Sequence, residues 1–351
     1  MENKIVKHIE VNGVTYDVPT IEGFDLVGKF GTTKEVQDIV NGGILSDLEY
    51  TAMVMQECKD KTDWNGKMKS VVYVDIPIGK VTNFKQAFEY NNKLQYLPAL
   101  QLDNATILES MFQYGAIPIL DTISMPNATN AKRVFYGTKI NKVQDEVVVD
   151  FGWLKDNNSF CDGSSFFQWS PTSYKRVIVT GDRCNNLSSF IANGNGSIDE
   201  FIALNTENVT TLNGIFSNID VKEATFGSVE KVTNFTNFTN TAKTYNKFTM
   251  LKMRNWKTTN IIISNVPNIL LIYIKYIIFH AMSIEDGATS RTLVLHATPL
   301  ATWNNEGTNT IPTADDAEFL EVEDWDRYKK DDGTLYTWGE IASLIKDITV
   351  A

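Results

Sequence analysis

Apolar and polar positions along the chain repeat a short pattern: a threonine, an apolar residue two positions later, and an apolar or aromatic residue four positions after that. Five segments carry this pattern clearly, and they begin at Thr82, Thr106, Thr129, Thr210 and Thr233. Their closing positions are 88, 112, 135, 216 and 239, so the first three copies stand 24 and 23 residues apart and the last two stand 23 residues apart. Repetition at an interval of this size predicts a solenoid, in which each copy is one small unit stacked on the next.

Weaker copies fill the rest of the same region. Asn185–Ile191 carries the pattern with asparagine in place of threonine, and in the copy from Thr233 the aromatic residue, Phe238, stands one position early. A degenerate copy around Gly163–Phe167 is padded by an insertion, which we place within residues 141–183. The repeat is therefore expected to continue through this irregular segment.

Each copy predicts a short helix or turn followed by a short strand. Threonine is a good N-cap, because its hydroxyl can accept a hydrogen bond from a free N–H of the first turn, and Thr106 with Glu109 completes a capping box. Further along each copy an apolar residue is followed three positions later by another, as in Ile117 and Leu120. In the fuller copies an alternation typical of a strand comes next. The sequence therefore predicts an α/β repeat solenoid over residues 80–297.

The N-terminal end of the chain does not repeat. Residues 1–79 predict an attachment or capping module, in which Ile9–Tyr16 is a hairpin that turns at Asn12-Gly13 and residues 44–58 are helical or mixed. A terminal module of a solenoid either covers the exposed core or joins the array to something else. The sequence leaves both roles open.

At the other end, residues 298–351 predict an acidic cap with a short helix at Trp338–Ile345. The most apolar stretch of the chain, Ile261–Met282, is long enough to span a bilayer, but Pro267 and Lys275 are among the residues that interrupt it. Burial of such groups in hydrocarbon would be costly. We therefore predict buried strands there, and no membrane insertion.

Charge and cysteine content narrow the function. The chain carries 43 acidic and 32 basic residues, a net charge of −11, and no basic cluster that would offset repulsion from a phosphate backbone. Nucleic-acid binding is not expected. The three cysteines, Cys58, Cys161 and Cys184, form no C-x-x-C pair, so we predict free thiols and no structural zinc site. Residues 1–10 lack the apolar core of a signal peptide, which predicts a protein assembled in the cytoplasm.

Candidate catalytic chemistry is sparse. His8, His280 and His296 are far apart, and no motif for a nucleophile, a cofactor or a metal site occurs, so we predict a non-enzymatic protein without a cofactor or metal. A depolymerase remains an alternative, because carboxylates at Asp145, Glu146 and Asp150 and at Asp199 and Glu200 stand near predicted strands. Asp331-Asp332-Gly333 could suggest calcium, but the spacing fits no EF-hand and a solvated acidic face is the preferred interpretation.

Recognition is better supported by the aromatic residues of the insertion. Seven aromatic side chains stand between Phe151 and Tyr174. We expect the phenylalanines to fill a local core, and we take Trp153, Trp169 and Tyr174 as candidate ligand-binding residues, since exposed aromatic rings stack on sugar rings or anchor protein partners. Thr82, Thr106, Thr129, Thr210 and Thr233 are taken as structural caps of the repeat.

The repeat units resemble a known family. Val81–Phe88, Ala105–Phe112 and Ala128–Ile140 are similar to the BspA-type leucine-rich repeats. The C-terminal segments Arg291–Ala297 and Lys346–Ala351 resemble the last repeat and cap of repeat proteins in gut Bacteroidota and in the tailed phages that infect them, including crAss-like phages. This resemblance implies a surface or virion protein used for attachment.

From that resemblance we expect a phage tail-fibre or receptor-binding protein that recognises a host surface glycan or protein. Residues 1–79 would join it to other virion proteins, and a homo-oligomer, a trimer by family analogy, would be its assembled form. The alternatives are a virion structural or adaptor protein, a bacterial surface adhesin, and the tail-associated polysaccharide depolymerase.

Overall fold

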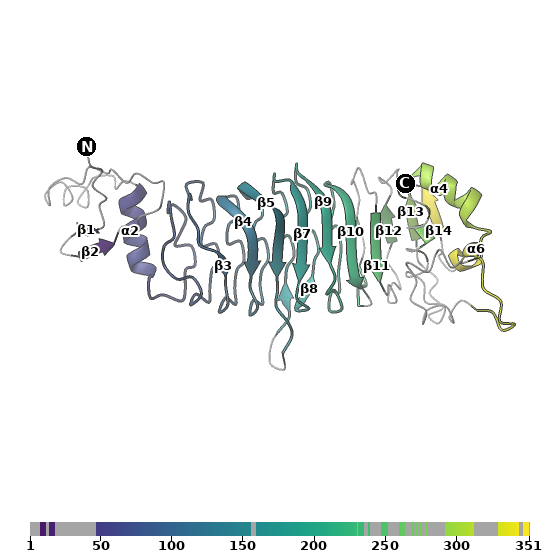
Figure 1. Cartoon of the computed structure of the whole chain (residues 1–351), viewed down its shortest axis with the longest axis horizontal. Coiled ribbons are helices and arrows are strands. Elements are labelled where there is room, and N and C mark those ends of the chain that lie inside the picture. The colour runs from purple at the N-terminus through teal and green to yellow at the C-terminus, as the bar shows by residue number, and fades with distance from the viewer. Residues whose placement is uncertain are drawn as a thin grey trace.

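In the computed structural model the chain is an elongated parallel β-solenoid with little helix (Figure 1). The structure describes residues 8–11, 14–17, 47–155, 159–229, 231–234, 238, 247–251, 260–263, 269, 271, 274, 275, 278, 292–311, 329–343 and 347–350. The predicted solenoid is therefore confirmed. In these residues its coils consist of parallel strands and turns, so the predicted α/β composition is not found.

Parallel strands form the main wall of the solenoid. In the order in which they pair, these strands are β3 (Leu100–Gln101), β4 (Ala116–Ser124), β5 (Lys139–Asp150), β7 (Tyr174–Thr180), β9 (Ser197–Ala203), β10 (Asp220–Ser228) and β11 (Lys247–Leu251). Each strand pairs with the strand of the next coil, so the chain must pass once around the solenoid between neighbouring strands.

A second parallel ladder runs along the same coils. It consists of β6 (Cys161–Asp162), which pairs with β8 (Cys184–Asn186), and of single-residue bridges. These bridges join Asp63, Asn83, Ile107, Asn130 and Asp162 in turn, and then Asn186, Thr211 and Asn234. This second ladder extends from Asp63 to Asn234 and gives the coils in that range a second wall.

The paired apolar residues three positions apart mark an outward bend in each strand. Ile117 and Leu120 are both buried in β4, and Ile198 and Phe201 are both buried in β9. In an ideal strand two residues three positions apart would face opposite sides. Here the two residues between them both face outward, and this arrangement recurs along the wall, so the spacing reports a bend.

The segments that follow the threonines are turns, which is one of the two alternatives, short helix or turn, that the sequence left open. The N–H groups of Phe84, Gln86 and Phe88 donate to carbonyls of the following coil at 2.7–2.9 Å. The intervening N–H of Ala87 donates within its own turn to Phe84, at 2.9 Å. In an α-helix each N–H would instead bond to the carbonyl four residues earlier. These units are thus turns joined by a ladder, and the α/β description does not apply to them.

The repeat threonines donate hydrogen bonds where we expected them to accept. The hydroxyl of Thr106 donates to the carbonyl of Thr82 at 3.1 Å, and that of Thr129 donates to the carbonyl of Thr106 at 3.2 Å. The hydroxyls of Thr82, Thr210 and Thr233 donate in the same way to the preceding coil. The threonines therefore join coil to coil, and Glu109, expected in a capping box, pairs with Lys85 of the preceding coil at 3.0 Å.

The residue after the threonine closes the turn. The side-chain oxygens of Asn83, Asn130 and Asn186 accept the N–H two residues further on, at 2.9–3.2 Å. This is an Asx turn, in which a short polar side chain takes the place of a backbone carbonyl. The sequence correctly predicted that a polar side chain closes these turns, but the residue that accepts the bond stands one position after the threonine.

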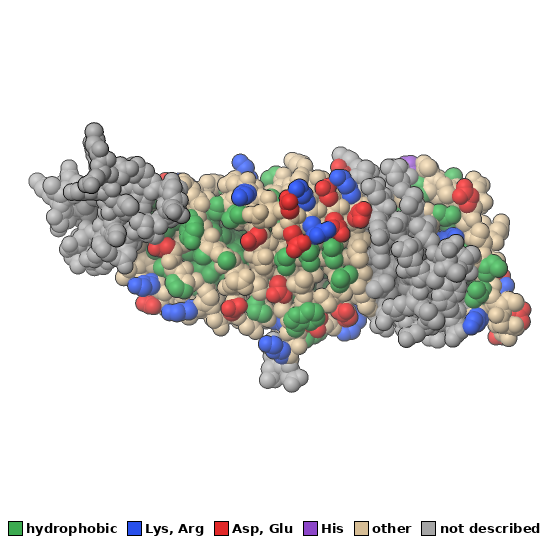
Figure 2. Space-filling model, viewed as in Figure 1, with side chains coloured by type: hydrophobic (Ala, Val, Ile, Leu, Met, Phe, Trp, Pro, Cys, Tyr) green, Lys and Arg blue, Asp and Glu red, His purple; other side chains and the backbone are tan. Residues whose placement is uncertain are grey.

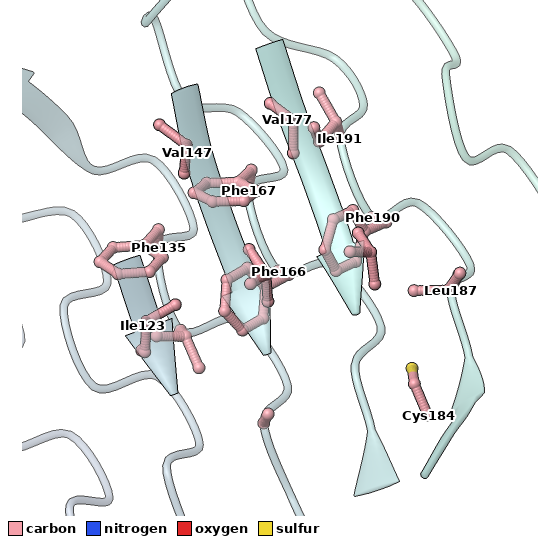
Figure 3. Packing of buried hydrophobic residues seen from close by; sticks show 14 of the residues in the cluster. Ile123, Phe135, Val147, Phe166, Phe167, Val177, Cys184, Leu187, Phe190 and Ile191 are labelled. Carbon is pink, nitrogen blue, oxygen red and sulfur yellow. The ribbon is translucent and has the colours of Figure 1, made fainter. Parts of the chain in front are cut away.

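Phenylalanine side chains stack along the interior. Phe88, Phe112, Phe135 and Phe167 hold the same place in successive coils, with ring centroids 4.9–5.3 Å apart and planes within 17° of parallel. Figure 3 shows this packing continuing through the irregular coil, where Phe166 lies between the walls. Each stacked aromatic pair adds about 0.5–1.5 kcal/mol to stability beyond the burial of its rings. A regular repeat interval therefore stabilises the core, because it places the rings in register for stacking.

The N-terminal boundary of the solenoid lies earlier than predicted. Asp63 already bridges to Asn83, and the N–H of Thr82 donates to the carbonyl of Thr62 at 2.8 Å, so a coil begins near residue 62. Helix α2 (Asp47–Cys58) contributes Val54, Met55 and Cys58 to the core at this end. The predicted hairpin is confirmed as β1 (His8–Val11) paired antiparallel with β2 (Val14–Asp17).

At the C-terminal end, β12 (Asn260–Ile263), β13 (Thr292–Leu295) and β14 (Asp347–Val350) form a parallel three-stranded sheet. Ile274 and Ile278, expected in a buried strand, are buried but lie in helical backbone. Among the described residues, no helix has the length and apolar character needed to cross a membrane.

Short helices complete this end: α4 (Ala297–Thr302), the π-helical η2 (Trp303–Gly307) and α6 (Trp338–Ala342). The capping helix predicted near Trp338 is confirmed, with a capping box of Thr337 and Glu340. A hydrogen bond from the Lys330 ammonium, followed by one from the Thr337 N–H, lowers the pKa of Glu340 to about 2. Most of the acidic segment lies outside the described residues.

Candidate functional site

The three aromatic residues chosen from the sequence do not form one site. Trp153 follows the carboxyl end of β5, whereas Trp169 precedes the amino end of β7, so parallel strands place them at opposite edges of the wall. Their side chains are 55% and 53% exposed. Tyr174 is only 2% exposed; its ring packs on Phe167 at 5.3 Å, and burial raises the pKa of its phenol. Tyr174 is thus a core residue here.

The loop that carries Trp153 projects beyond the carboxyl ends of the strands (Figure 1). Its base is held by a buried cation, since the side chain of Arg183 is 1% exposed. The guanidinium donates to the carbonyls of Ser159 at 2.7 and 3.2 Å and of Phe151 at 3.4 Å, which lie on either side of the projecting segment. It also donates to the carbonyls of Pro126 and Ala128, on the preceding coil.

Arg183 therefore ties the loop base to the solenoid through neutral acceptors. Burial lowers the pKa of its guanidinium, because the charge has left water. Asp182 adds a further contact, since its carboxylate accepts the Leu154 N–H at 2.6 Å. This anchor could not be predicted from the sequence, because an isolated arginine in a loop is normally exposed.

The carboxylates considered for depolymerase chemistry do come together. Asp145, Glu146, Asp199 and Glu200 line a cleft of about 540 Å³ on the outer face of the wall, beside basic side chains. Figure 2 shows red and blue side chains interleaved there in one cluster. The strand register explains the meeting, since Glu146 is opposite Arg176 and Arg176 is opposite Glu200.

These four carboxylates are all ion-paired. Arg176 bonds Glu200 at 2.6 Å and contacts Glu146 at 3.4 Å. Lys175 pairs with Asp145, and Lys222 with Asp199, both at 2.6 Å. Glycoside cleavage requires one carboxyl group that delivers a proton to the leaving oxygen. The paired arrangement instead suits a solvated face that holds neighbouring coils in register.

Asp150, the fifth of these carboxylates, has a structural setting. It accepts from the Ser124 hydroxyl at 2.9 Å, the Gly152 N–H at 2.8 Å and the Thr180 hydroxyl at 3.3 Å. Its oxygens are therefore used to join three neighbouring coils where the loop begins. None of these three bonds involves a residue that lines the charged cleft.

The predicted thiols and histidines can be compared with the structure in part. Cys58, Cys161 and Cys184 are free and buried, as expected, and burial raises the pKa of Cys184 to about 12. His296 has a structural role as the N-cap of α4, where its Nδ1 accepts the Thr298 N–H at 3.2 Å. His280 lies outside the described residues, within which no group of three potential metal ligands occurs.

Comparison with known proteins adds no assignment: no protein-family model, no curated protein and no solved structure shows a significant match to the chain.

Proposed function

We propose that this chain is a non-enzymatic attachment protein of a phage virion, of the tail-fibre or receptor-binding kind, whose solenoid recognises a host-surface ligand. The observation that carries the proposal is a set of large aromatic side chains left exposed on an elongated solenoid. Six are between 40% and 58% exposed: Tyr90, Tyr96, Tyr114, Trp153, Phe160 and Trp169. Tyrosine and tryptophan are enriched at recognition surfaces because each combines a large apolar ring with a polar atom.

The scaffold suits this role because it holds these rings in fixed positions. Backbone and side-chain hydrogen bonds join each coil to the next, as at Thr106 and Phe88. A surface that is rigid before it binds loses little conformational freedom on binding. An elongated rod also supports separate functions at its two ends, one for anchoring and one for recognition.

The finer assignment follows from the sequence resemblance. We propose that the chain is a BspA-type leucine-rich-repeat protein of the kind found in phages of gut Bacteroidota. Its N-terminal module would bind other virion proteins, and the assembled form would be a homo-oligomer. A virion adaptor, which binds phage subunits instead of a host ligand, is the competing proposal.

An adsorption competition tests the proposal. Purified chain is added to host cells before the phage, and the rate of phage adsorption is measured. An attachment protein should occupy the receptor and slow adsorption in proportion to its concentration. Unchanged adsorption at saturating protein would contradict the proposal and favour the adaptor, for which labelling of the intact particle should place the chain between other subunits.

The depolymerase alternative has its own assay. Incubation of capsular polysaccharide with the purified chain should leave the polymer length unchanged, as measured by size-exclusion chromatography. A shortened polymer would contradict the non-enzymatic proposal. Substitution of Glu146 and Glu200 by glutamine would then establish whether the charged cleft is responsible.

A further inference from the structure

We propose that Tyr90, Tyr114, Tyr136 and Trp169, here called the aromatic edge, bind a neutral polysaccharide chain that runs along the solenoid axis. This inference rests on the proposed function, because it names the ligand class and the surface of an attachment protein. It replaces the site chosen from the sequence: Trp169 remains, Tyr174 is buried, and the tyrosines of earlier coils join it.

The aromatic edge is a row of side chains that the repeat places along the solenoid. Tyr90, Tyr114 and Trp169 each stand two residues after the closing position of their coil. Their N–H groups donate to the next coil, as in the 2.8 Å bond from Tyr114 to the carbonyl of Tyr136. The place between the coils of Tyr114 and Trp169 is held by Gly137, whose N–H continues the ladder to Gln168 at 2.8 Å. Tyr90 and Tyr114 are therefore one coil apart and Trp169 is two coils beyond Tyr114, while Tyr136, next to Gly137, supplies the ring of the coil between them.

Local backbone chemistry argues against aromatic residues at this place. Tyr90, Tyr114 and Trp169 have φ values of 59°, 54° and 62°, in the left-handed region. Bulky side chains are uncommon there, whereas glycine and asparagine are tolerated. The same place in other coils holds such residues, with Gly137 at 64° and Asn193 at 57°. Aromatic rings thus occupy positions where the fold itself favours asparagine or glycine.

Packing offsets this conflict for the tyrosines. Tyr90 and Tyr114 stack at 5.4 Å, and Tyr114 meets Tyr136 edge to face at 5.3 Å. The ring of Tyr114 lies over Gly137, where an added Cβ would fall 2.5 Å from it. For Trp169 no aromatic ring packs against it among the described residues, and its side chain is 53% exposed. Local strain without burial to offset it is a mark of functional sites.

The surroundings select the ligand class. The row is flanked by half-buried amides, Gln113 and Gln168, and the guanidinium of Arg133 lies over the ring of Tyr136 at 5.8 Å. A sugar ring offers a C–H face to an aromatic ring and hydroxyls to amides and phenols, which matches apolar platforms with polar borders. A net charge of −11 disfavours polyanions. A neutral polysaccharide meets both conditions.

The test uses a substitution that the fold itself supplies. Trp169→Asn places at this position the residue that the next coil already carries in the same conformation, at Asn193. Binding is measured on an array of neutral gluco-, manno- and galacto-oligosaccharides, with uronate-containing oligosaccharides beside them. We expect the wild type to bind one neutral series, Trp169→Asn to bind it at least about tenfold more weakly, and the melting temperature of the variant to be unchanged or raised.

The matched control is Leu204→Asn, since Leu204 is as exposed as Trp169 (53%) but follows the carboxyl end of β9, at the opposite edge. It should bind like the wild type. Tyr114→Asn gives a second variant on the edge, with an expected loss of the same kind. A structural role for Trp169 would lower the melting temperature instead, and would overturn the inference.

The outcomes separate this inference from the proposed function. Wild-type protein that slows phage adsorption but binds no neutral sugar, or that binds only uronates, overturns the inference and leaves the attachment role standing. Equal binding by Trp169→Asn and wild type also overturns it. Sugar binding that is lost in Trp169→Asn, without any effect of the wild type on adsorption, supports the site and contradicts the attachment role.

Discussion

Arg183 gives the sharpest test of how the irregular coil is built. Its guanidinium donates to the carbonyls of Pro126, Ala128, Phe151 and Ser159, and so links the base of the projecting loop to the preceding coil. Replacement by methionine keeps much of the side-chain volume and removes every donor. These four carbonyls would then lose their hydrogen bonds to the guanidinium.

The magnitude follows from these contacts. A buried polar group left without its partner costs about 1–3 kcal/mol, and water that enters the loop base recovers part of this. Removal of a buried charge returns a further part, because the guanidinium no longer has to be desolvated. For four carbonyls, we expect Arg183→Met to lower the free energy of unfolding of the surrounding coils by about 2–4 kcal/mol.

Urea unfolding, combined with amide hydrogen exchange resolved by mass spectrometry, measures this effect and places it. Exchange should rise first in the coils around the loop, since neighbouring repeats can open separately. Arg176→Met is the matched control: it removes an exposed arginine with two ion pairs on the same wall, and should unfold at the urea concentration of the wild type. The reasoning is refuted if both variants unfold together with the wild type.

Three further predictions concern the ladder, the C-terminal cap and the thiols. Because the hydroxyl of Thr106 donates to the carbonyl of Thr82, Thr106→Asp should lower the free energy of unfolding by about 1 kcal/mol in urea titrations; an N-cap would accept aspartate without loss. Glu340 has a lowered pKa of about 2, so its stabilising contribution is complete above its unfolded pKa, about 4.3, and is lost as the pH falls through 2. The melting temperatures of wild type and Glu340→Gln should therefore converge between pH 5 and pH 2, and a constant difference would be inconsistent with this. Burial raises the pKa values of Cys161 and Cys184, so iodoacetamide at pH 8 should modify them far more slowly in folded than in unfolded protein, as followed by mass spectrometry; equal rates would count against their burial.

The sequence predicted the solenoid because its repeat carries both the polar ladder and the aromatic core. The five threonines mark one edge of the second ladder, and the phenylalanines that close the pattern stack inside. The same pattern also contained a copy that we missed: Thr62, Trp64 and Met68 keep the spacing, and Trp64 is fully buried. Its interval of 20 residues to the next copy obscured it.

Helix and turn could not be separated from the spacing alone. Apolar residues four positions apart share a face in a helix, but they also face inward in a turn that alternates its hydrogen bonds between its own coil and the next. The difference lies in left-handed residues such as Gln86 and Ser110, neither of which is a residue type that announces such a conformation. Tertiary hydrogen bonds between coils therefore decided the local structure.

A candidate binding residue could be predicted from the sequence only where its place in the coil determines whether its side chain is exposed. Trp169 stands two residues after a closing position and points outward, whereas Tyr174 begins a strand and points inward. The meeting of Glu146 and Glu200 depended on strand register across an insertion, which the sequence did not define. The role of Arg183 could not be predicted either, because it depends on which carbonyls the folded loop base brings around the guanidinium.

The distance between equivalent positions along the rod tests the solenoid most directly. Spin labels on cysteines introduced at Tyr90 and, in turn, at Trp169, Asn193 and Asn218 report positions three, four and five coils apart, which can be measured by double electron–electron resonance. Parallel neighbouring strands are about 4.8 Å apart, so the three mean distances should increase steadily, near about 14, 19 and 24 Å before the label length is included. Three distances that fail to rise with coil number would contradict the stacked-coil structure on which the account depends.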